Sequence, residues 1–271
     1  MSRTIAFIGG GNMASAIIQG LRRQAGGAPD LLVVEPHAPT RDRLQAEFGL
    51  QAAAEAGPAL ARAELVVWAV KPQVFREAAA PCADHVRQAL HLSVAAGIPS
   101  AAIARWLGSE RIVRAMPNTP ALIGRGIAGL YARAGVGAAD RALVEQVMAA
   151  TGESLWLSDE SLLDAVTALS GSGPAYVFYF LEAMQAAGTA MGLEPQQAYR
   201  LAIATFSGAA ELARASSETP QVLRERVTSR GGTTQAAITA LEAAGVRAAF
   251  ERAMQAARDR GAEMGREFGA G

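Results

Sequence analysis

The sequence has few of the residues that mark secreted, metal-binding or membrane-spanning proteins. Among 271 residues, Cys82 is the one cysteine, which cannot form an internal disulfide and favours a reducing, cytoplasmic location. Aromatic residues make up 6% of the chain and charged residues 18%. No apolar run approaches the roughly 18 residues that cross a bilayer. Because 25 basic residues balance 25 acidic ones, neither nucleic acid nor an anionic membrane is an expected partner.

Residues typical of hydrolytic and metal sites are also scarce. The three histidines, His37, His85 and His91, have no Ser, Cys or carboxylate partner at the spacing of a catalytic triad or a metal site. Each is more readily explained as a structural or exposed side chain. A hydrolase triad is therefore not supported, and no metal is expected.

Short apolar segments dominate the first part of the chain. They are typical of buried strands and occur at Thr4–Ile8, Leu31–Val34, Leu65–Val70, Leu90–Val94, Ile112–Ala115, Ile127–Tyr131 and Ser154–Leu157. Helical or loop segments separate them, which predicts a doubly wound, mostly parallel sheet with helices on both faces. The expected class is α/β, with a Rossmann domain over residues 1–158.

From residue 159 to 271 the strand signal disappears and alanine-rich helical patterns replace it. An all-helical second domain is therefore expected. In its last segment, Ile238, Leu241, Val246, Phe250 and Met254 fit one face of an amphipathic helix. The chain has too few aromatic side chains to cover such an apolar face by itself. This favours burial of the face against a partner subunit.

A glycine-rich turn follows the first predicted strand. Residues 9–14 read Gly-Gly-Gly-Asn-Met-Ala, which fits G-x-G-x-x-A, and they precede Glu35 by about 20 residues. In this pattern Gly9 permits the tight turn, Gly11 lets the backbone approach a pyrophosphate, and the helix N-terminus offers N–H groups to phosphate. An ordinary glycine-rich turn is the alternative, but the strand, helix and acidic residue together favour dinucleotide binding.

The coenzyme preference stays open at this point. Glu35 sits where a carboxylate would bind the adenine ribose and disfavour a 2′-phosphate, which favours NAD. His37, Arg41 and Arg43 follow closely, and a cation there could pair with the phosphate of NADP. These three residues could equally form a solvated helix face.

Three further loops lie where ligands of open α/β sheets bind. They are 71–73, the small-residue segment 93–97 and 116–120. The segment 93–97 would let a flat nicotinamide ring lie against the chain, and Asn118 could bond its carboxamide or ribose. The segment 228–234 combines two glycines with hydroxyl residues before a helix, which is typical of an anion site or of a plain N-cap.

With these residues in view, the chain resembles the Δ1-pyrroline-5-carboxylate reductase family along essentially its whole length. The motifs that carry the resemblance are Phe7 to Met13, Val70 to Gln73, Ser93 to Gly97, Arg114 to Pro120, Leu169 to Tyr176 and Ser229 to Thr234. The last two are the most specific. Arg230 departs from the family pattern, which more often has proline between the serine and the glycines, and its effect on the loop stays open.

The resemblance implies reduction of L-1-pyrroline-5-carboxylate to L-proline, the last step of proline biosynthesis, with NADPH or also NADH. It implies a helical dimerisation domain, as a homodimer or a decamer of dimers. Applied to the matching positions of this sequence, the resemblance assigns cofactor binding to Gly9, Gly11, Asn12, Met13, Glu35, Lys71, Pro72, Ala95 and Asn118. It assigns the substrate to Ser229, Gly231, Gly232, Thr233 and Thr234. Thr234 is the expected hydrogen-bond donor to the imine nitrogen.

Two other functions are alternatives to this one. A β-hydroxyacid dehydrogenase would resemble the chain at the N-terminus only, and it would need a catalytic lysine in the helical domain, where residues 158–271 contain none. A catalytically silent dimer that senses NADPH would bind cofactor without turnover. Only an activity assay separates this second alternative from the reductase.

Overall fold

The computed structural model describes residues 3–24 and 29–269, which fall into two compact units. One unit, here called the sheet unit, combines the described residues up to Gly173 with those from Ala256 onward. The other, here called the helical unit, is Pro174–Gln255. The contacts therefore group the C-terminal turns of the last helix with the sheet, whereas the sequence placed all residues after 158 in the second domain.

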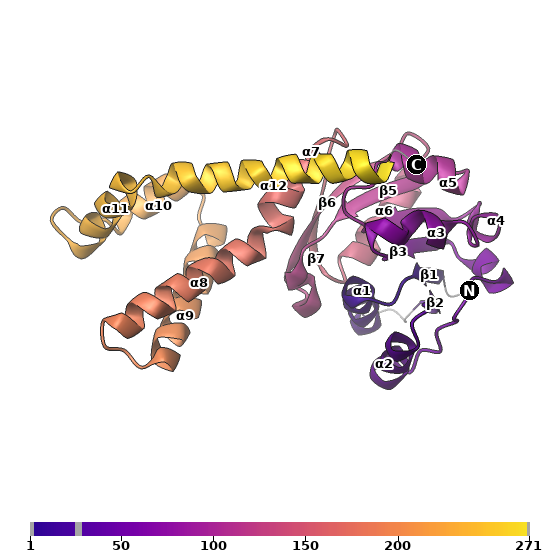
Figure 1. The fold of residues 1–271 in the computed structure, drawn as a ribbon, viewed down its shortest axis with the longest axis horizontal. Coiled ribbons are helices and arrows are strands. Elements are labelled where there is room, and N and C mark those ends of the chain that lie inside the picture. The colour runs from indigo at the N-terminus through magenta and orange to yellow at the C-terminus, as the bar shows by residue number, and fades with distance from the viewer. Residues whose placement is uncertain (1–2, 25–28, 270–271) are drawn as a thin grey trace. The chain divides into compact units, whose positions relative to one another are not determined.

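A seven-stranded sheet forms the centre of the sheet unit (Figure 1). Its strands are β1 (Thr4–Ile8), β2 (Asp30–Val34), β3 (Leu65–Trp68), β4 (Leu90–Ser93), β5 (Ile112–Met116), β6 (Gly126–Ala132) and β7 (Gly152–Trp156). They lie in the order β2-β1-β3-β4-β5-β6-β7. All neighbours are parallel except β5 and β6, so the predicted mostly parallel Rossmann sheet is confirmed.

Both faces of this sheet are buried, which explains why its inner strands read as continuous apolar runs. In β3, Leu65 and Val67 belong to one hydrophobic core, and Val66 and Trp68 belong to the core on the opposite face. The strand order reverses at β1: β2 lies on one side of β1 in the sheet, and β3 and the later strands lie on the other side. Ligands of open α/β sheets bind at such a switch point, outside the carboxyl ends of the strands.

Helices cover the sheet and connect its strands. In the sheet unit they are α1 (Asn12–Arg23), α2 (Ala38–Phe48), α3 (Phe75–Ala79), α4 (Ala83–Val86), α5 (Ser100–Leu107), α6 (Ala138–Met148) and α7 (Leu162–Val166). Helix α2 has Pro39 in its first turn and ends at Gly49, whose φ of 60° is the left-handed conformation that glycine adopts most easily. A proline start and a glycine stop thus define the two ends of this helix.

The helical unit contains no strand among its described residues. It consists of α8 (Gly173–Ala190), α9 (Pro195–Ala215), α10 (Pro220–Arg226), α11 (Thr233–Ala243) and the first turns of α12 (Val246–Gly269). The expectation of one amphipathic helix from Ile238 to Met254 is wrong, because Gly245 at φ 67° separates α11 from α12. Ile238, Leu241, Val246 and Phe250 nevertheless face one cavity of about 270 Å³.

Large apolar side chains are exposed on the long helices of this unit. On α8 they include Phe178 and Tyr179, and on α9 they include Leu201 and Leu212. Large apolar side chains exposed in this number are typical of a surface that another subunit covers. No helix in the described part of the chain is long and apolar enough to cross a membrane.

Candidate active site

The glycine-rich turn after β1 has the shape of a phosphate cradle. Gly9 has φ 95°, and a Cβ atom there would lie 2.7 Å from the carbonyl oxygen of Ala69, so only glycine fits. At Gly11, by contrast, a Cβ atom would meet nothing within 4 Å. Gly11 precedes α1, which has no side-chain cap and no acidic residue in its first turn. The turn therefore leaves open space beside the N–H groups of a helix N-terminus, which suits a pyrophosphate.

The carboxylate of Glu35 braces this turn. Its Oε2 accepts a hydrogen bond from the N–H of Gly10 at 2.8 Å, and its Oε1 accepts one from the N–H of His37 at 2.8 Å. The residue is 8% exposed. Glu35 thus lies at the predicted place after β2, but its two oxygens are held by the backbone and little of it is left to face a ribose.

Two cationic side chains donate to backbone carbonyl oxygens at or next to Glu35 and the glycine turn. Arg41 donates from Nη1 to the carbonyl oxygens of Glu35 and Pro36, at 2.9 and 2.7 Å. Arg43 donates from Nη2 to the carbonyl oxygen of Gly10 at 2.8 Å. Each guanidinium has further N–H donors. The segment after β2 therefore presents positive charge at the entrance of α2, where a 2′-phosphate would lie.

A cavity of about 450 Å³ opens beside the glycine turn. Residues at or just after the carboxyl ends of β1, β2 and β3 line it, among them Ile8, Gly9, Val34, Pro36 and Val70. Val74, Ala54 and Ala56 add apolar surface. The size and the mostly apolar lining suit an adenosine group, which the sequence could not locate because the loop 54–56 has no motif.

The other expected cofactor residues also lie at this carboxyl edge. Asn12 is exposed at the start of α1, and Met13 is half-buried behind it. Lys71 and Pro72 follow β3, and Lys71, the only lysine of the sequence, is exposed.

Ala95 and Asn118 mark two further loops at the same edge. Ala95 lies in the loop after β4 and is 5% exposed. Asn118 follows β5 and accepts the N–H of Ile127 at its Oδ1, 3.0 Å away, which leaves its amide N–H groups to donate. The sheet topology thus brings the expected cofactor residues to one edge of one unit.

The expected substrate residues form the loop before α11 in the helical unit. Gly231 has φ 72°, and its N–H donates to the side-chain oxygen of Gln235. The N–H of Gly232 donates to the carbonyl oxygen of Ser229 at 3.0 Å. Thr233 begins α11, whose first turn has no side-chain cap and no acidic residue. The donors of this helix start are therefore the N–H groups of Thr233 and Thr234 rather than that of Gly232.

Two buried titratable side chains, His91 and Cys82, are held in their uncharged forms. His91 is fully buried in β4, accepts the indole N–H of Trp68 at Nδ1, 3.2 Å away, and has a pKa lowered to about 4, chiefly by burial. Burial raises the pKa of the Cys82 thiol to about 11. Within residues 3–24 and 29–269, no three His, Cys, Asp or Glu side chains gather as a metal site would require.

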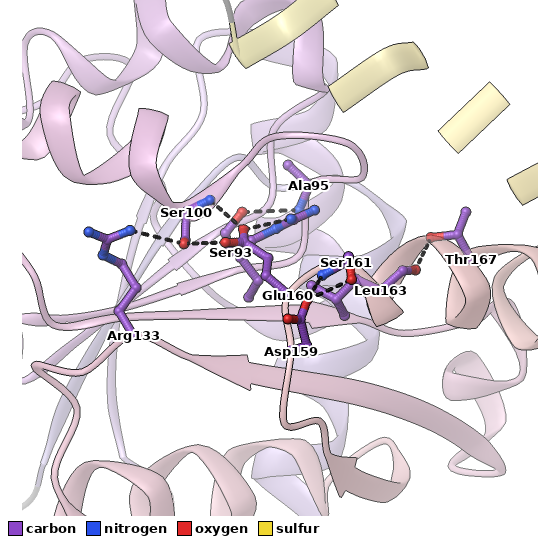
Figure 2. A network of polar contacts seen from close by, with 10 residues as sticks. Ser93, Ala95, Ser100, Arg133, Asp159, Glu160, Ser161, Leu163 and Thr167 are labelled. Carbon is purple, nitrogen blue, oxygen red and sulfur yellow. Dashed lines mark hydrogen bonds and ion pairs between the residues drawn. The ribbon is translucent and has the colours of Figure 1, made fainter. Parts of the chain in front are cut away.

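Sequence reasoning missed a buried polar network beside Ala95. Figure 2 shows Glu160, from the loop after β7, pointing toward Ser100 at the start of α5. Glu160 also pairs with Arg114 of β5 at 2.8 Å. One signal was available: Arg114 stands inside the apolar run of β5, and an arginine is almost never buried without a partner.

Two family models match separate parts of the chain. A model described as pyrroline-5-carboxylate reductase dimerisation matches residues 160–264. A model described as NADP oxidoreductase coenzyme F420-dependent matches residues 4–97, which include the glycine turn.

Full-length similarity extends these matches. The chain is 45% identical to a pyrroline-5-carboxylate reductase of Pseudomonas aeruginosa, over 98% of each protein. It is similar to the structure of a pyrroline-5-carboxylate reductase from Coxiella burnetii, with 35% identity, a TM-score of 0.87, and coverage of 97% of this chain and 99% of that one. A Plasmodium falciparum pyrroline carboxylate reductase with NADP bound gives 27% identity and a TM-score of 0.86, with coverage of 97% and 98%.

Proposed function

Because the chain belongs to the pyrroline-5-carboxylate reductase family, we propose that the carboxyl edge of its sheet holds the dinucleotide and that the loop before α11 holds the pyrroline ring. The protein is an NAD(P)-dependent reductase that converts L-1-pyrroline-5-carboxylate to L-proline in proline biosynthesis. We assign the roles of its individual residues from the geometry of the two regions. The observation that carries them is the open space at Gly11, which faces the uncapped start of α1.

The dinucleotide is assigned to the sheet unit. Gly9, Gly11, Asn12 and Met13 would hold the pyrophosphate, because the turn is tight at Gly9 and open at Gly11. The adenosine group would fill the cavity of about 450 Å³ beside the turn. Glu35 would keep the turn in shape, and NADPH is the expected donor because Arg41 and Arg43 are bonded to the backbone of Glu35 and of Gly10. NADH remains a second donor.

The nicotinamide end is assigned to Lys71, Pro72, Ala95 and Asn118. These residues follow β3, β4 and β5, which are neighbours in the sheet. When bound, the reduced dinucleotide supplies a hydride to the carbon of the imine. The methyl group of Ala95 is small enough to let a flat ring lie against the loop. The amide N–H groups of Asn118 can hold the carboxamide, since its Oδ1 is already bonded to Ile127.

The substrate is assigned to Ser229, Gly231, Gly232, Thr233 and Thr234. The N–H groups at the start of α11 attract a carboxylate, because the helix N-terminus carries a partial positive charge. The hydroxyl of Thr234 would donate a hydrogen bond to the imine nitrogen. This hydrogen bond would activate the adjacent carbon for hydride transfer. Positioning of the two reactants then supplies most of the rate, and no side chain need act as a nucleophile.

The match of residues 160–264 to a dimerisation model indicates a homodimer. We propose further that dimers assemble into a decamer, and that residues 1–158 bind the dinucleotide while 159–271 bind substrate and form the dimer. A cytoplasmic location is proposed from the single, buried, free thiol of Cys82.

One assay tests the function and the coenzyme together. Purified protein is mixed with pyrroline-5-carboxylate and either NADPH or NADH, and the loss of reduced-nicotinamide absorbance is followed. We expect turnover with both and a higher kcat/KM with NADPH. Cofactor binding without turnover would instead identify the silent NADPH-sensing dimer.

A further inference from the structure

A cluster of three residues fixes the start of α5, and it is here called the Glu160 cluster. The Oε1 of Glu160 accepts the backbone N–H of Ser100 at 2.5 Å and Nη1 of Arg114 at 2.8 Å. Its Oε2 accepts the hydroxyl of Ser100 at 2.7 Å. Figure 2 shows the Ser100 hydroxyl between Glu160 and Arg133, which donates to it at 3.2 Å. One carboxylate from the β7–α7 loop thus joins β5 to α5.

The Glu160 cluster is charged and largely buried. Ser100 has no exposed surface, the side chain of Arg114 is 10% exposed, and that of Glu160 is 24% exposed where it lines a cavity of about 600 Å³. Burial acts to raise the pKa of Glu160, but the hydrogen bonds from Ser100 and Arg114 outweigh it and leave that pKa below its usual value. Glu160 is therefore ionised at neutral pH. Removing its charge would leave a buried guanidinium uncompensated, which is strongly unfavourable.

The Glu160 cluster is bonded to the residue that ends the loop 94–99, and this loop belongs to the proposed site. Ser100 follows directly on the loop 94–99, which contains Ala95. At the other end of this loop, the N–H of Ala95 donates to Oγ of Ser93 at 3.4 Å. Glu160 binds both the N–H and the hydroxyl of Ser100, so it fixes the end of the loop nearest to α5.

The last turns of α12 hold the same loop from another side. Gly261, Gly265 and Gly269 are four residues apart and share one face of the helix. A Cβ atom at Gly265 would lie 3.1 Å from the carbonyl oxygen of Gly97, and one at Gly269 would lie 2.9 Å from the ring of Pro99. The helix can lie this close only because it lacks side chains there. The loop therefore cannot shift without disturbing either α12 or the Glu160 cluster.

We propose that Glu160 is a positioning residue for hydride transfer. Through Ser100 and Arg114 it holds the loop 94–99 in the one place where Ala95 can support the nicotinamide ring. This proposal rests on the proposed function, because it takes Ala95 to border the nicotinamide. A displacement of reacting groups by about 1 Å can cost about a hundredfold in rate. A loop held on two sides is a means to prevent such a displacement.

The direct test is Glu160→Gln, which keeps the shape of the side chain and removes its charge. Two ligands are compared by titration: NADPH, and 2′-phospho-ADP-ribose, which is the same molecule without the nicotinamide. We expect the dissociation constant of NADPH to rise about tenfold and that of the fragment to stay within about twofold, because only the nicotinamide contacts the loop. Hydrogen exchange of the amides of residues 94–99 should become faster without ligand, and kcat should fall at least about tenfold.

Asp140→Asn is the matched control. Asp140 pairs with Arg111 at 2.6 Å in the same unit, so its loss removes an ion pair, with a more exposed arginine, without touching the loop 94–99. It should lower the melting temperature and leave kcat, the two affinities and the exchange of 94–99 unchanged. Equal effects of both variants would mean that Glu160 stabilises the fold in general and would overturn the proposal.

If Glu160→Gln does not fold, a second variant tests whether displacement of the loop 94–99 weakens NADPH binding. Gly265→Ala introduces a methyl group against the carbonyl oxygen of Gly97 and leaves the charges intact. It should reproduce the loss of NADPH affinity with unchanged binding of the fragment. Normal NADPH affinity and normal kcat in the folded variants would refute the proposal. A wild-type protein that binds both ligands but never oxidises NADPH with pyrroline-5-carboxylate would refute the proposed function instead.

Discussion

The carboxylate of Glu35 accepts the backbone N–H of Gly10 at 2.8 Å, which ties the end of β2 to the glycine turn after β1. Its other oxygen is bonded to the N–H of His37. A residue at this position commonly decides between NAD and NADP by meeting the adenine ribose. Here the side chain is buried and its first partners are backbone groups. Glu35 therefore shapes the turn, and we propose that Arg41 and Arg43 are the groups that meet the coenzyme.

The variant Glu35→Gln tests this role. One amide oxygen can replace only one of the two carboxylate acceptors, so the turn should loosen toward both coenzymes. We expect kcat/KM to fall by about fivefold to tenfold with NADPH and with NADH, the cost of about one buried hydrogen bond. The ratio of the two values should stay within about twofold. A clear rise of the NADPH to NADH ratio would show instead that residue 35 meets the ribose.

Substitutions at two positions of the glycine turn should affect different properties, cofactor affinity at Gly11 and stability at Gly9. Gly11→Val should fold normally, since a Cβ atom there meets nothing within 4 Å, and should weaken NADPH binding by at least about tenfold by filling the pyrophosphate space. Gly9→Ala should lower the free energy of unfolding by about 1–3 kcal/mol, because φ is 95° and the new methyl group would press on Ala69. Thermal melts and NADPH titrations measure both effects. Wild-type NADPH affinity in Gly11→Val would mean that the turn does not hold the dinucleotide.

Periodicity predicted the seven strands because each contains a short apolar run, which the two cores bury on both faces in β1 and β3. It could not predict that β6 runs antiparallel to β5, since direction depends on the connection and not on the residues of the strand. Periodicity also predicted a single helix where the structure has two, α11 and α12. The apolar spacing continues from Leu241 to Val246, and only the left-handed conformation of Gly245 shows where the helix ends.

For the proposed site, the sequence identified residues that belong to local motifs and missed those that contact a partner far away in the chain. Gly9 and Gly11 belong to a local pattern that one segment contains completely. Glu160 and Ser100 are 60 residues apart and carry no motif, so only the fold brings them together. Arg114 in an apolar strand was the one local sign that such a partner existed.

Stability should depend on pH through His91. Its pKa is about 4 in the folded protein, chiefly because of burial and then because of Arg111, against 6.5 for the ordinary side chain. The unfolded chain therefore binds the proton more readily between these values, and stability is lost as pH falls from 6.5 toward 4. The loss should approach about 3 kcal/mol in denaturant titrations. In His91→Asn, whose side-chain oxygen can still accept from Trp68, the loss over this range should be much smaller; an unchanged loss would assign it to other groups.

The dimer should depend on the exposed apolar face of α9. Leu201 is 56% exposed, and a charge at this position would have to be buried when a second subunit covers it. We expect Leu201→Glu to raise the dimer dissociation constant by more than about a hundredfold in sedimentation experiments. Gln196→Glu, an exposed polar position on the same helix, is the control and should remain dimeric. An intact dimer in Leu201→Glu would place the interface elsewhere.

The substrate loop should respond differently at Thr234 and at Gly232. Thr234→Val keeps the branched shape and removes the hydroxyl that is assigned to the imine nitrogen. We expect the loss of about 1–3 kcal/mol of transition-state stabilisation, which is a drop of about fivefold to 150-fold in kcat/KM. NADPH affinity should not change, because the dinucleotide is assigned to the other unit. Steady-state kinetics and an NADPH titration measure the two quantities.

Gly232→Ala serves as the companion variant because it alters the loop without removing a donor. A Cβ atom there would lie 2.5 Å from Oγ of Ser229, so the serine side chain must move away from its place in the substrate loop. This change should raise KM for pyrroline-5-carboxylate more than it lowers kcat, whereas Thr234→Val should act mainly on kcat. If Thr234→Val keeps full activity while Gly232→Ala still raises KM, the loop binds the carboxylate but the donor to the nitrogen is another group, such as Ser170 or an ordered water. If neither variant changes the kinetics, the loop is only the cap of α11.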